Sequence, residues 1–153
     1  SWTPNQYPYN LTLELDKNQT ISKVDYLPRQ DGSENGRILG YSIYTSVDGI
    51  KYEKASSGTW GNNSDKKTAT FNPVTAKYVK IEVTNGQNGF ASAAEVDILT
   101  DSPSVKPYVL PKNTMKASAN SEESSGSASK AIDGKTDTFW HSSWTPNQYP
   151  YNL

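Results

Sequence analysis

Apolar and polar residues alternate with a period of two along much of the chain. In residues 76–84 (AKYVKIEVT), every second residue from Val79 to Val83 is a branched aliphatic residue, and charged residues lie between them. Residues 11–16 (LTLELD) alternate leucines with polar residues in the same way. Successive side chains of a strand point to opposite faces, so this pattern predicts strands with one buried face and one solvent-facing face.

Other short segments are also typical of strands. They are residues 21–27 (ISKVDYL), two runs within 37–55 that meet at Asp48-Gly49, residues 68–74 (TATFNPV) and residues 94–100 (AEVDILT). An Asp-Gly pair between two such runs is a strong hairpin signal. Only residues 127–134 (SASKAIDG) suggest a helical turn. Several short strands about ten residues apart predict an all-β domain, either a sandwich or a jelly roll.

The composition supports a small all-β domain. A chain of 153 residues is long enough for one domain with its own core, and its ten tyrosines and four tryptophans suggest an aromatic surface. The net charge of −1 disfavours a nucleic-acid binder or a basic membrane patch. No apolar run approaches the length of a membrane span, and nothing resembles a signal peptide. The absence of cysteine excludes a disulfide framework and a thiolate zinc site.

The string SWTPNQYPYNL occurs twice, at residues 1–11 and at residues 143–153. The copies start at residues 1 and 143, hence 142 residues apart, which is about the length of one domain. The proline-rich residues 101–107 and their surroundings are typical of a linker. We therefore predict one domain that runs from residue 108 to residue 153 and continues from residue 11 to residue 100.

Both copies of the repeat suit a single position in that domain. One molecule can seat only one copy there, so the other is displaced, belongs to a neighbouring domain or exchanges between molecules. Engineering, a tandem array and domain-swapped self-association are three open explanations. Trp2 or Trp144, with the tyrosines that follow each, is expected beside His141. Packing of these aromatic residues under the neighbouring loop is favoured there over direct contact with a ligand.

Three segments, taken in cyclic order, resemble a discoidin, or F5/8 type C, domain. They are residues 125–144 (SGSASKAIDGKTDTFWHSSW), 11–49 and 77–99. More narrowly, they resemble the bacterial family 32 carbohydrate-binding modules. The absence of cysteine fits that branch, because many animal discoidin domains carry a terminal disulfide. The resemblance implies a galactose-binding-like jelly-roll β-sandwich whose termini are neighbours, so that a cyclic shift is sterically tolerable.

The segment KAIDGKTDT (130–138) contains an Asp-Gly turn. From spacing alone, an ordinary turn is the simpler interpretation, although such a loop can also offer carbonyl and side-chain oxygens to a hard cation. The resemblance implies a structural calcium ion with ligands from both ends of the domain. They are the carbonyls of Lys130, Lys135 and Ala94, the carboxylates of Asp133 and Glu95, and both oxygens of Thr138.

His141 is the only histidine, and a lone histidine is more often structural than a ligand contact. The resemblance implies a sugar site that combines His141 with Arg29 in LPRQ, Asn35 in ENGR and Phe90 in NGQNGFAS. Phe90 would stack on the apolar face of a pyranose, while the three polar side chains bond its hydroxyls. An axial 4-hydroxyl would reach His141 and Arg29, whereas an equatorial one would not. Core packing of Phe90 and a solvated Arg29 are the alternatives.

The sequence contains no catalytic constellation that we can identify. It has no cysteine for a nucleophilic dyad and no defensible pair of glycosidase carboxylates. We expect a non-catalytic module that binds terminal galactose or N-acetylgalactosamine on glycans, in a secreted or cell-surface bacterial protein. There it would hold an attached glycoside hydrolase near its substrate. A discoidin-like lipid- or protein-binding adhesion module is the alternative, which the acidic pI and sparse lysine runs disfavour.

Overall fold

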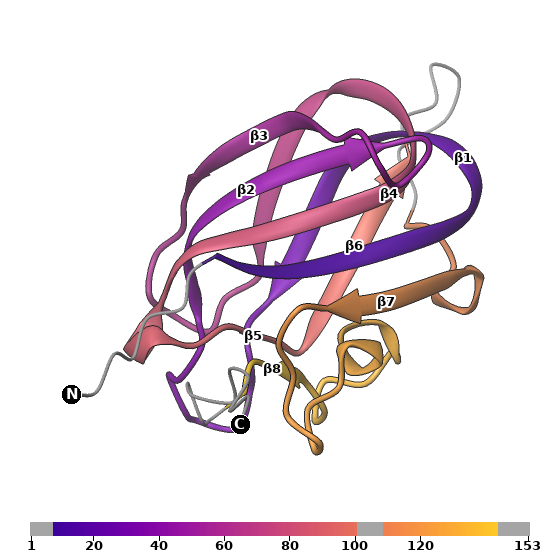
Figure 1. The fold of residues 1–153 in the computed structure, drawn as a ribbon. Helices are drawn as coiled ribbons and strands as arrows, with labels where there is room; N and C mark the ends of the chain where they lie inside the picture. Colours follow the sequence, from indigo (N-terminus) through magenta and orange to yellow (C-terminus); the bar gives the residue numbers. More distant parts are fainter. Residues whose placement is uncertain (1–7, 101–108, 144–153) are drawn as a thin grey trace, which may run out of the picture.

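Strands dominate the computed structural model, which describes residues 8–100 and 109–143 (Figure 1). Within these residues, three short 3₁₀ turns accompany the strands: η1 (Gln87–Gly89), η2 (Lys112–Thr114) and η3 (Ala128–Ile132). The strands are β1 (Tyr9–Leu27), β2 (Ile38–Ser46), β3 (Glu53–Thr59), β4 (Lys67–Gly86), β5 (Ser92–Ala93), β6 (Glu95–Thr100), β7 (Met115–Ala119) and β8 (Trp140–His141). The all-β prediction is therefore confirmed, and the expected helical turn is η3. The described residues contain no helix with the length and apolar character that a membrane span requires.

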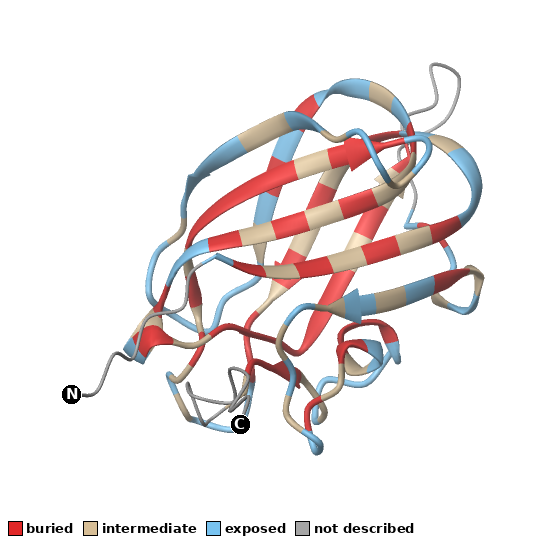
Figure 2. Cartoon of the chain, in the orientation of Figure 1, coloured by how far each residue is buried: buried red, intermediate tan, exposed pale blue. Residues whose placement is uncertain are grey.

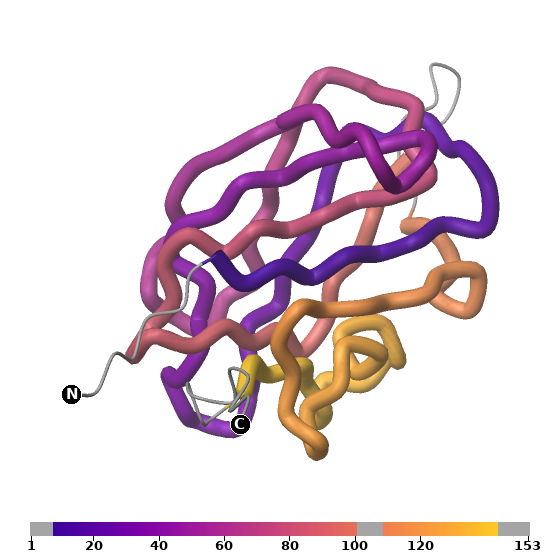
Figure 3. The backbone as a smooth tube through the Cα atoms, in the orientation of Figure 1, coloured from indigo at the N-terminus to yellow at the C-terminus, as the bar shows by residue number. Residues whose placement is uncertain are grey.

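Two long strands, β1 and β4, run through both layers of a β-sandwich. The first half of β1 pairs with the second half of β4, and β2, β3 and β7 extend this layer. The second half of β1 pairs with the first half of β4 and with β6. A register shift between Glu14 and Gln19 marks the place where β1 bends, as the tube in Figure 3 shows. One layer is thus β3-β2-β4-β1-β7, and the other is β4-β1-β6.

The core lies between these two layers. Figure 2 shows buried and more exposed residues alternating along the strands, as the period-two pattern predicts. Full burial of one aliphatic side chain is worth about 1.5–3 kcal/mol, so this stripe is a main source of stability. Its members from β1 and β4 include Leu11, Leu13, Leu15, Val79, Ile81 and Val83, all at most 2% exposed.

The structure joins segments that the pattern treats as separate strands. Residues 11–16 and 21–27 both belong to β1, and residues 68–74 and 76–84 both belong to β4. The polar residues between the first pair are largely exposed but keep an extended backbone as the strand turns between layers. Strands β5, β7 and β8 were not among the predicted strands: β5 and β8 have two residues each, and β7 is rich in small residues.

The β2–β3 hairpin forms where the Asp48-Gly49 pair predicts it. Thr45 pairs with Glu53 in antiparallel register, and Gly49 has a φ of +74°. The Asp48 carboxylate accepts hydrogen bonds from the backbone N–H groups of Ile50 (2.8 Å) and Lys51 (2.9 Å). The side chain of Asp48 and the flexibility of Gly49 therefore define the turn together.

We expect Gly49→Ala to lower the free energy of unfolding by about 1–2 kcal/mol or more, measured by urea denaturation. The left-handed backbone disfavours any Cβ, and an added Cβ would lie 2.9 Å from Cζ of Tyr78. Gly32→Ala is the matched control, because Gly32 has a φ of +84° but no atom within 4 Å of such a Cβ. A smaller loss in Gly49→Ala than in Gly32→Ala would show that the Tyr78 ring is not in the way.

Residues 109–143 complete the sandwich. β7 pairs with β1, and β8 pairs with β5 through Ser92 and His141. Trp140 is fully buried, and its Nε1 donates to the Ser121 carbonyl at 2.9 Å. The segments on the two sides of residues 101–108 therefore share one core. The predicted linker at 101–107 lies outside the described residues, and the cyclic domain order stays a prediction.

The first copy of the repeat opens β1. Tyr9 is 4% exposed, its hydroxyl donates to the Gly89 carbonyl at 2.8 Å, and Leu11 is fully buried. Both residues pack in the core. For Tyr9, this agrees with the prediction that the aromatic residues of the repeat pack against the domain. Trp2, Trp144 and the second copy from residue 144 onward lie outside the described residues, so self-association through that copy stays a prediction.

Candidate functional site

The four predicted sugar-binding residues meet at one end of the sandwich. Arg29 and Asn35 lie in the loop between β1 and β2, Phe90 follows η1, and His141 belongs to β8 (Figure 1). The ring centroids of Phe90 and His141 are 5.5 Å apart. Nη1 of Arg29 donates to the Asn35 carbonyl at 3.3 Å. The fold thus gathers residues from three separate segments.

Backbone contacts hold the Asn35-Gly36 turn against the loop that carries Phe90. The Gly36 N–H donates to the Gln87 carbonyl at 3.0 Å, and the Ser92 N–H donates to the Gly36 carbonyl at 2.7 Å. A Cβ at Gly36 would lie within 3.0 Å of Ala91 and Ser92, so this close approach needs glycine. The two loops are therefore fixed relative to each other.

Arg29 is held from two sides. Its Nε and Nη2 donate to the two carboxylate oxygens of Asp31 at 2.8 and 2.5 Å, a bidentate pair that lowers the pKa of Asp31. Its guanidinium carbon lies 4.2 Å from the centroid of the Phe139 ring. Arg29 is only 6% exposed, so the alternative of a solvated loop charge is wrong.

His141 is buried, with an exposure of 1%. Burial lowers the pKa of its imidazole below the ordinary value, and the positive charge of Arg29 lowers it further. Nδ1 lies 2.5 Å from the Ser142 carbonyl, which assigns the proton of the neutral ring to Nδ1. Nε2 is then the acceptor nitrogen.

Asn35 and Phe90 are half-buried and complete the cluster. The Asn88 amide donates to Oδ1 of Asn35 at 2.6 Å, which leaves the Asn35 amide group to act as a donor. Asn88 itself has a φ of 61°, a conformation that asparagine tolerates better than most residues. Phe90 contacts His141 but also keeps part of its ring exposed, so packing and ligand stacking are compatible.

A second cluster lies around Asp133. Its Oδ1 accepts from the Lys135 N–H at 2.9 Å, and its Oδ2 accepts from Thr138 Oγ1 at 2.5 Å. Glu95 of β6 is 6% exposed; burial raises the pKa of its carboxyl, and the nearby Asp133 carboxylate raises it further. Oε2 of Glu95 pairs with Lys112, whereas Oε1 is buried and receives no hydrogen bond from the described residues.

This arrangement fits a cation that takes mixed oxygen ligands. Two carboxylates from distant segments lie near each other, and one buried carboxylate oxygen lacks a donor. Among residues 8–100 and 109–143, no three His, Cys, Asp or Glu side chains form a metal cluster by themselves. A calcium ion here would therefore need carbonyl and hydroxyl oxygens, as predicted for Lys130, Lys135, Ala94 and Thr138.

Comparison with known proteins decides the family. The model of the F5/8 type C domain matches residues 1–96, more than half of the chain. The chain belongs to the F5/8 type C, or discoidin, family. The family and the β-sandwich implied by the resemblance are therefore confirmed. The match does not include residues 109–143, which carry His141 and Asp133.

Solved structures of family 32 carbohydrate-binding modules are similar to this discoidin domain. Module CBM32-5 of Clostridium perfringens, in complex with GalNAc-β-1,3-galactose, is 41% identical with a TM-score of 0.58. That alignment covers 60% of this chain and 65% of the module. The family 32 module of NanJ from Clostridium perfringens, in complex with galactose, is 31% identical with a TM-score of 0.56. Here the coverage is 64% and 72%.

The curated relatives are much longer proteins. The A type blood N-acetyl-α-D-galactosamine deacetylase of Flavonifractor plautii is 33% identical over 100 residues, and a galactose oxidase of Gibberella zeae is 31% identical over 103 residues. Each alignment covers 65% of this chain. The chain spans 13% of the deacetylase and 15% of the oxidase.

Two residues that hold Arg29 in this discoidin domain had no assignment from the sequence, namely Asp31 and Phe139. Both lie two positions from a predicted site residue, Asp31 from Arg29 and Phe139 from His141, which is the only signal that could have found them. They also help to line a hollow of about 310 Å³ beside the predicted sugar-binding residues, together with Gln30, Thr136 and Asp137.

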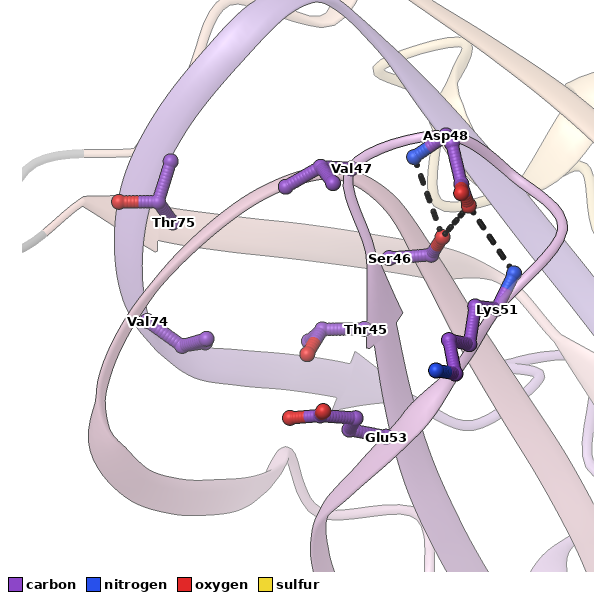
Figure 4. Close-up of a pocket in the computed structure, with 8 residues that line it drawn as sticks. All are labelled: Thr45, Ser46, Val47, Asp48, Lys51, Glu53, Val74 and Thr75. Atoms are coloured by element: carbon purple, nitrogen blue, oxygen red, sulfur yellow. Dashed lines mark hydrogen bonds between the residues drawn. The ribbon is translucent and has the colours of Figure 1, made fainter.

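Another hollow, of about 270 Å³, lies at the opposite end of β2 (Figure 4). The dashed lines show that Asp48 and Ser46 bond to each other and to the turn. These polar groups therefore maintain the hairpin of the discoidin domain, and we assign no ligand to them. The lining residues are Thr45, Ser46, Val47, Asp48, Lys51, Glu53, Val74 and Thr75.

The lowered pKa of His141 predicts a pH-dependent stability. Below about pH 6.5 the unfolded chain takes up a proton that the folded domain resists, so stability is full above that pH and falls as the pH drops. The slope can reach about 1.4 kcal/mol per pH unit. Urea unfolding at pH 7, 6 and 5 measures it, and His141→Gln should give a shallower decline. Equal slopes in both proteins would contradict this, because the carboxyls, including Glu95, contribute equally to each.

Proposed function

We propose that this chain is a non-catalytic module that binds terminal galactose or N-acetylgalactosamine. The observation that carries the proposal is the convergence of His141, Arg29, Asn35 and Phe90 at one end of the sandwich. The two family 32 modules described above add support, since they were solved with GalNAc-β-1,3-galactose and with galactose.

The chemistry of the cluster suits a sugar edge. Phe90 offers a partly exposed ring to the apolar face of a pyranose, and Asn35 offers amide donors to its hydroxyls. Nε2 of His141 accepts from an axial 4-hydroxyl, while the guanidinium of Arg29 donates to the same oxygen. An equatorial 4-hydroxyl, as in glucose, lies in the ring plane and misses this pair.

The affinity should be weak. Arg29 and His141 are 6% and 1% exposed, so these two side chains offer a sugar only a small contact area. Few ligand atoms are desolvated by such a site, which places the dissociation constant on the order of 0.1 to 1 mM. Weak single-site binding is useful when a module is tethered to another domain, because tethering raises the effective concentration of that domain at the glycan.

We infer from the relatives what kind of protein contains this module. Their names denote proteins that act on carbohydrates, and this chain corresponds to 13–15% of their length. The proposal is that the module belongs to a longer, secreted or surface-exposed bacterial protein with an enzyme that acts on galactose-containing glycans. Hydrolysis is the enzyme activity we expect there.

A calcium ion is the proposed structural partner of the Asp133 cluster. It would supply the positive charge that Glu95 and Asp133 need, and it would fasten the 130–138 loop to β6. The carbonyls of Lys130, Lys135 and Ala94, with Thr138, would complete about six to eight oxygen ligands.

A glycan array tests the proposed function. The module should retain glycans that end in galactose or N-acetylgalactosamine and should ignore those that end in glucose or mannose. Phosphatidylserine vesicles test the alternative adhesion function on the same protein. Vesicle binding without glycan binding would replace the proposal with a lipid-binding one.

A further inference from the structure

The Lys112 side chain lies between two acidic residues of β6. Its Nζ contacts Oε2 of Glu95 and lies 2.8 Å from Oδ1 of Asp97. The side chains of Lys112 and Glu95 are 22% and 8% exposed, so this pair is largely removed from water. Because Lys112 has two carboxylate partners, it can leave one of them without losing its counter-charge.

The negative charge of Glu95 and Asp133 is only partly balanced by Lys112. Oε1 of Glu95 is buried without a hydrogen-bond donor among the described residues, and the Asp133 carboxylate lies near it. A buried carboxylate oxygen that lacks a donor is costly. The ammonium group of Lys112 therefore serves Oε2 of Glu95, whereas Oε1 is left without a donor among the described residues.

We infer that Lys112 is a built-in counter-ion that competes with the divalent cation at the Glu95–Asp133 cluster. In the cation-free domain its ammonium neutralises Glu95. When a cation binds between Glu95 and Asp133, Lys112 shifts its pairing to Asp97. The inference rests on the calcium site proposed above. Lys112 thereby stabilises the cation-free fold and at the same time lowers the affinity for calcium.

Calcium titration calorimetry on variants of Lys112 tests this role. Lys112→Met keeps the unbranched stem but removes the charge, so calcium should bind at least about tenfold more tightly, since a like charge a few ångströms away is lost. Lys112→Arg keeps the charge and should bind within about threefold of the unmodified protein. Lys116→Met is the matched control, because Lys116 on β7 is in register with Glu14 of β1, whereas the ion pair of Glu95 is with Lys112. It should leave the affinity unchanged.

Thermal unfolding supplies an independent readout. In EDTA, Lys112→Met should unfold at a lower temperature than the unmodified protein, and saturating calcium should remove most of that difference. Calcium binding that is no tighter in Lys112→Met than in the unmodified protein overturns the competition and leaves the calcium site in place. Absence of calcium binding in both proteins overturns the site and the competition together.

Discussion

Arg29→Ala and His141→Ala are each expected to abolish measurable galactose binding while the domain stays folded. Loss of the charged Arg29 partner costs about 1.5–3 kcal/mol, and loss of the neutral His141 acceptor, which leaves a buried hydroxyl unpaired, costs about 1–3 kcal/mol; the larger values correspond to roughly a hundredfold weakening. From a starting dissociation constant on the order of 0.1 to 1 mM, that loss leaves no detectable binding. Titration calorimetry measures the affinity, and near-ultraviolet circular dichroism of the buried Trp140 checks the fold.

The neighbouring arginine supplies the control for that experiment. Arg37 lies in the same loop, but its Nη1 faces Glu34 at 3.5 Å and Asn62 at 3.3 Å. Arg37→Ala should therefore retain galactose binding. Phe90→Ala should weaken binding through loss of the stacking ring. Unchanged affinity in both Arg29→Ala and His141→Ala would contradict the assignment of this site.

Asp133→Ala is expected to remove the dependence of the thermal midpoint on chelator. A ligand of the folded state that is present at about a thousand times its dissociation constant stabilises by about 4 kcal/mol. Micromolar calcium binding at millimolar calcium corresponds to this ratio. Differential scanning calorimetry with calcium or EDTA should thus show a large shift for the unmodified protein and almost none for Asp133→Ala.

Asp137→Ala is the matched control for the calcium experiment. Asp137 is an exposed aspartate of the same loop and is not among the predicted ligands, so this variant should keep the chelator response. If EDTA does not change the thermal midpoint of the unmodified protein, elemental analysis should determine whether calcium is bound. Absence of calcium in that analysis would contradict the calcium site.

The fold was largely predictable because its signal is local. The period-two alternation of Leu11 to Leu15 and of Val79 to Val83 predicts which face is buried, and the Asp48-Gly49 pair predicts the hairpin. The continuity of β1 was not predictable, because polar residues at 16–20 resemble a turn while the strand bends between layers. β5 and β8 are too short to carry a periodic pattern.

The candidate site depended on a different kind of information. Spacing alone does not connect Arg29 with His141, and these residues were grouped through the family resemblance. The structure brings them together and adds Asp31 and Phe139, whose roles follow from side-chain packing. The contact of Lys112 with Glu95 likewise depends on how η2 packs against β6, which no local pattern specifies.

The central claim is recognition of an axial 4-hydroxyl at the His141–Arg29 cluster. Titration of the unmodified protein with galactose, N-acetylgalactosamine and glucose, under identical conditions, tests it most directly. The first two sugars should bind with dissociation constants on the order of 0.1 to 1 mM, and glucose should give no measurable heat. Binding of glucose as strong as that of galactose would contradict the claim.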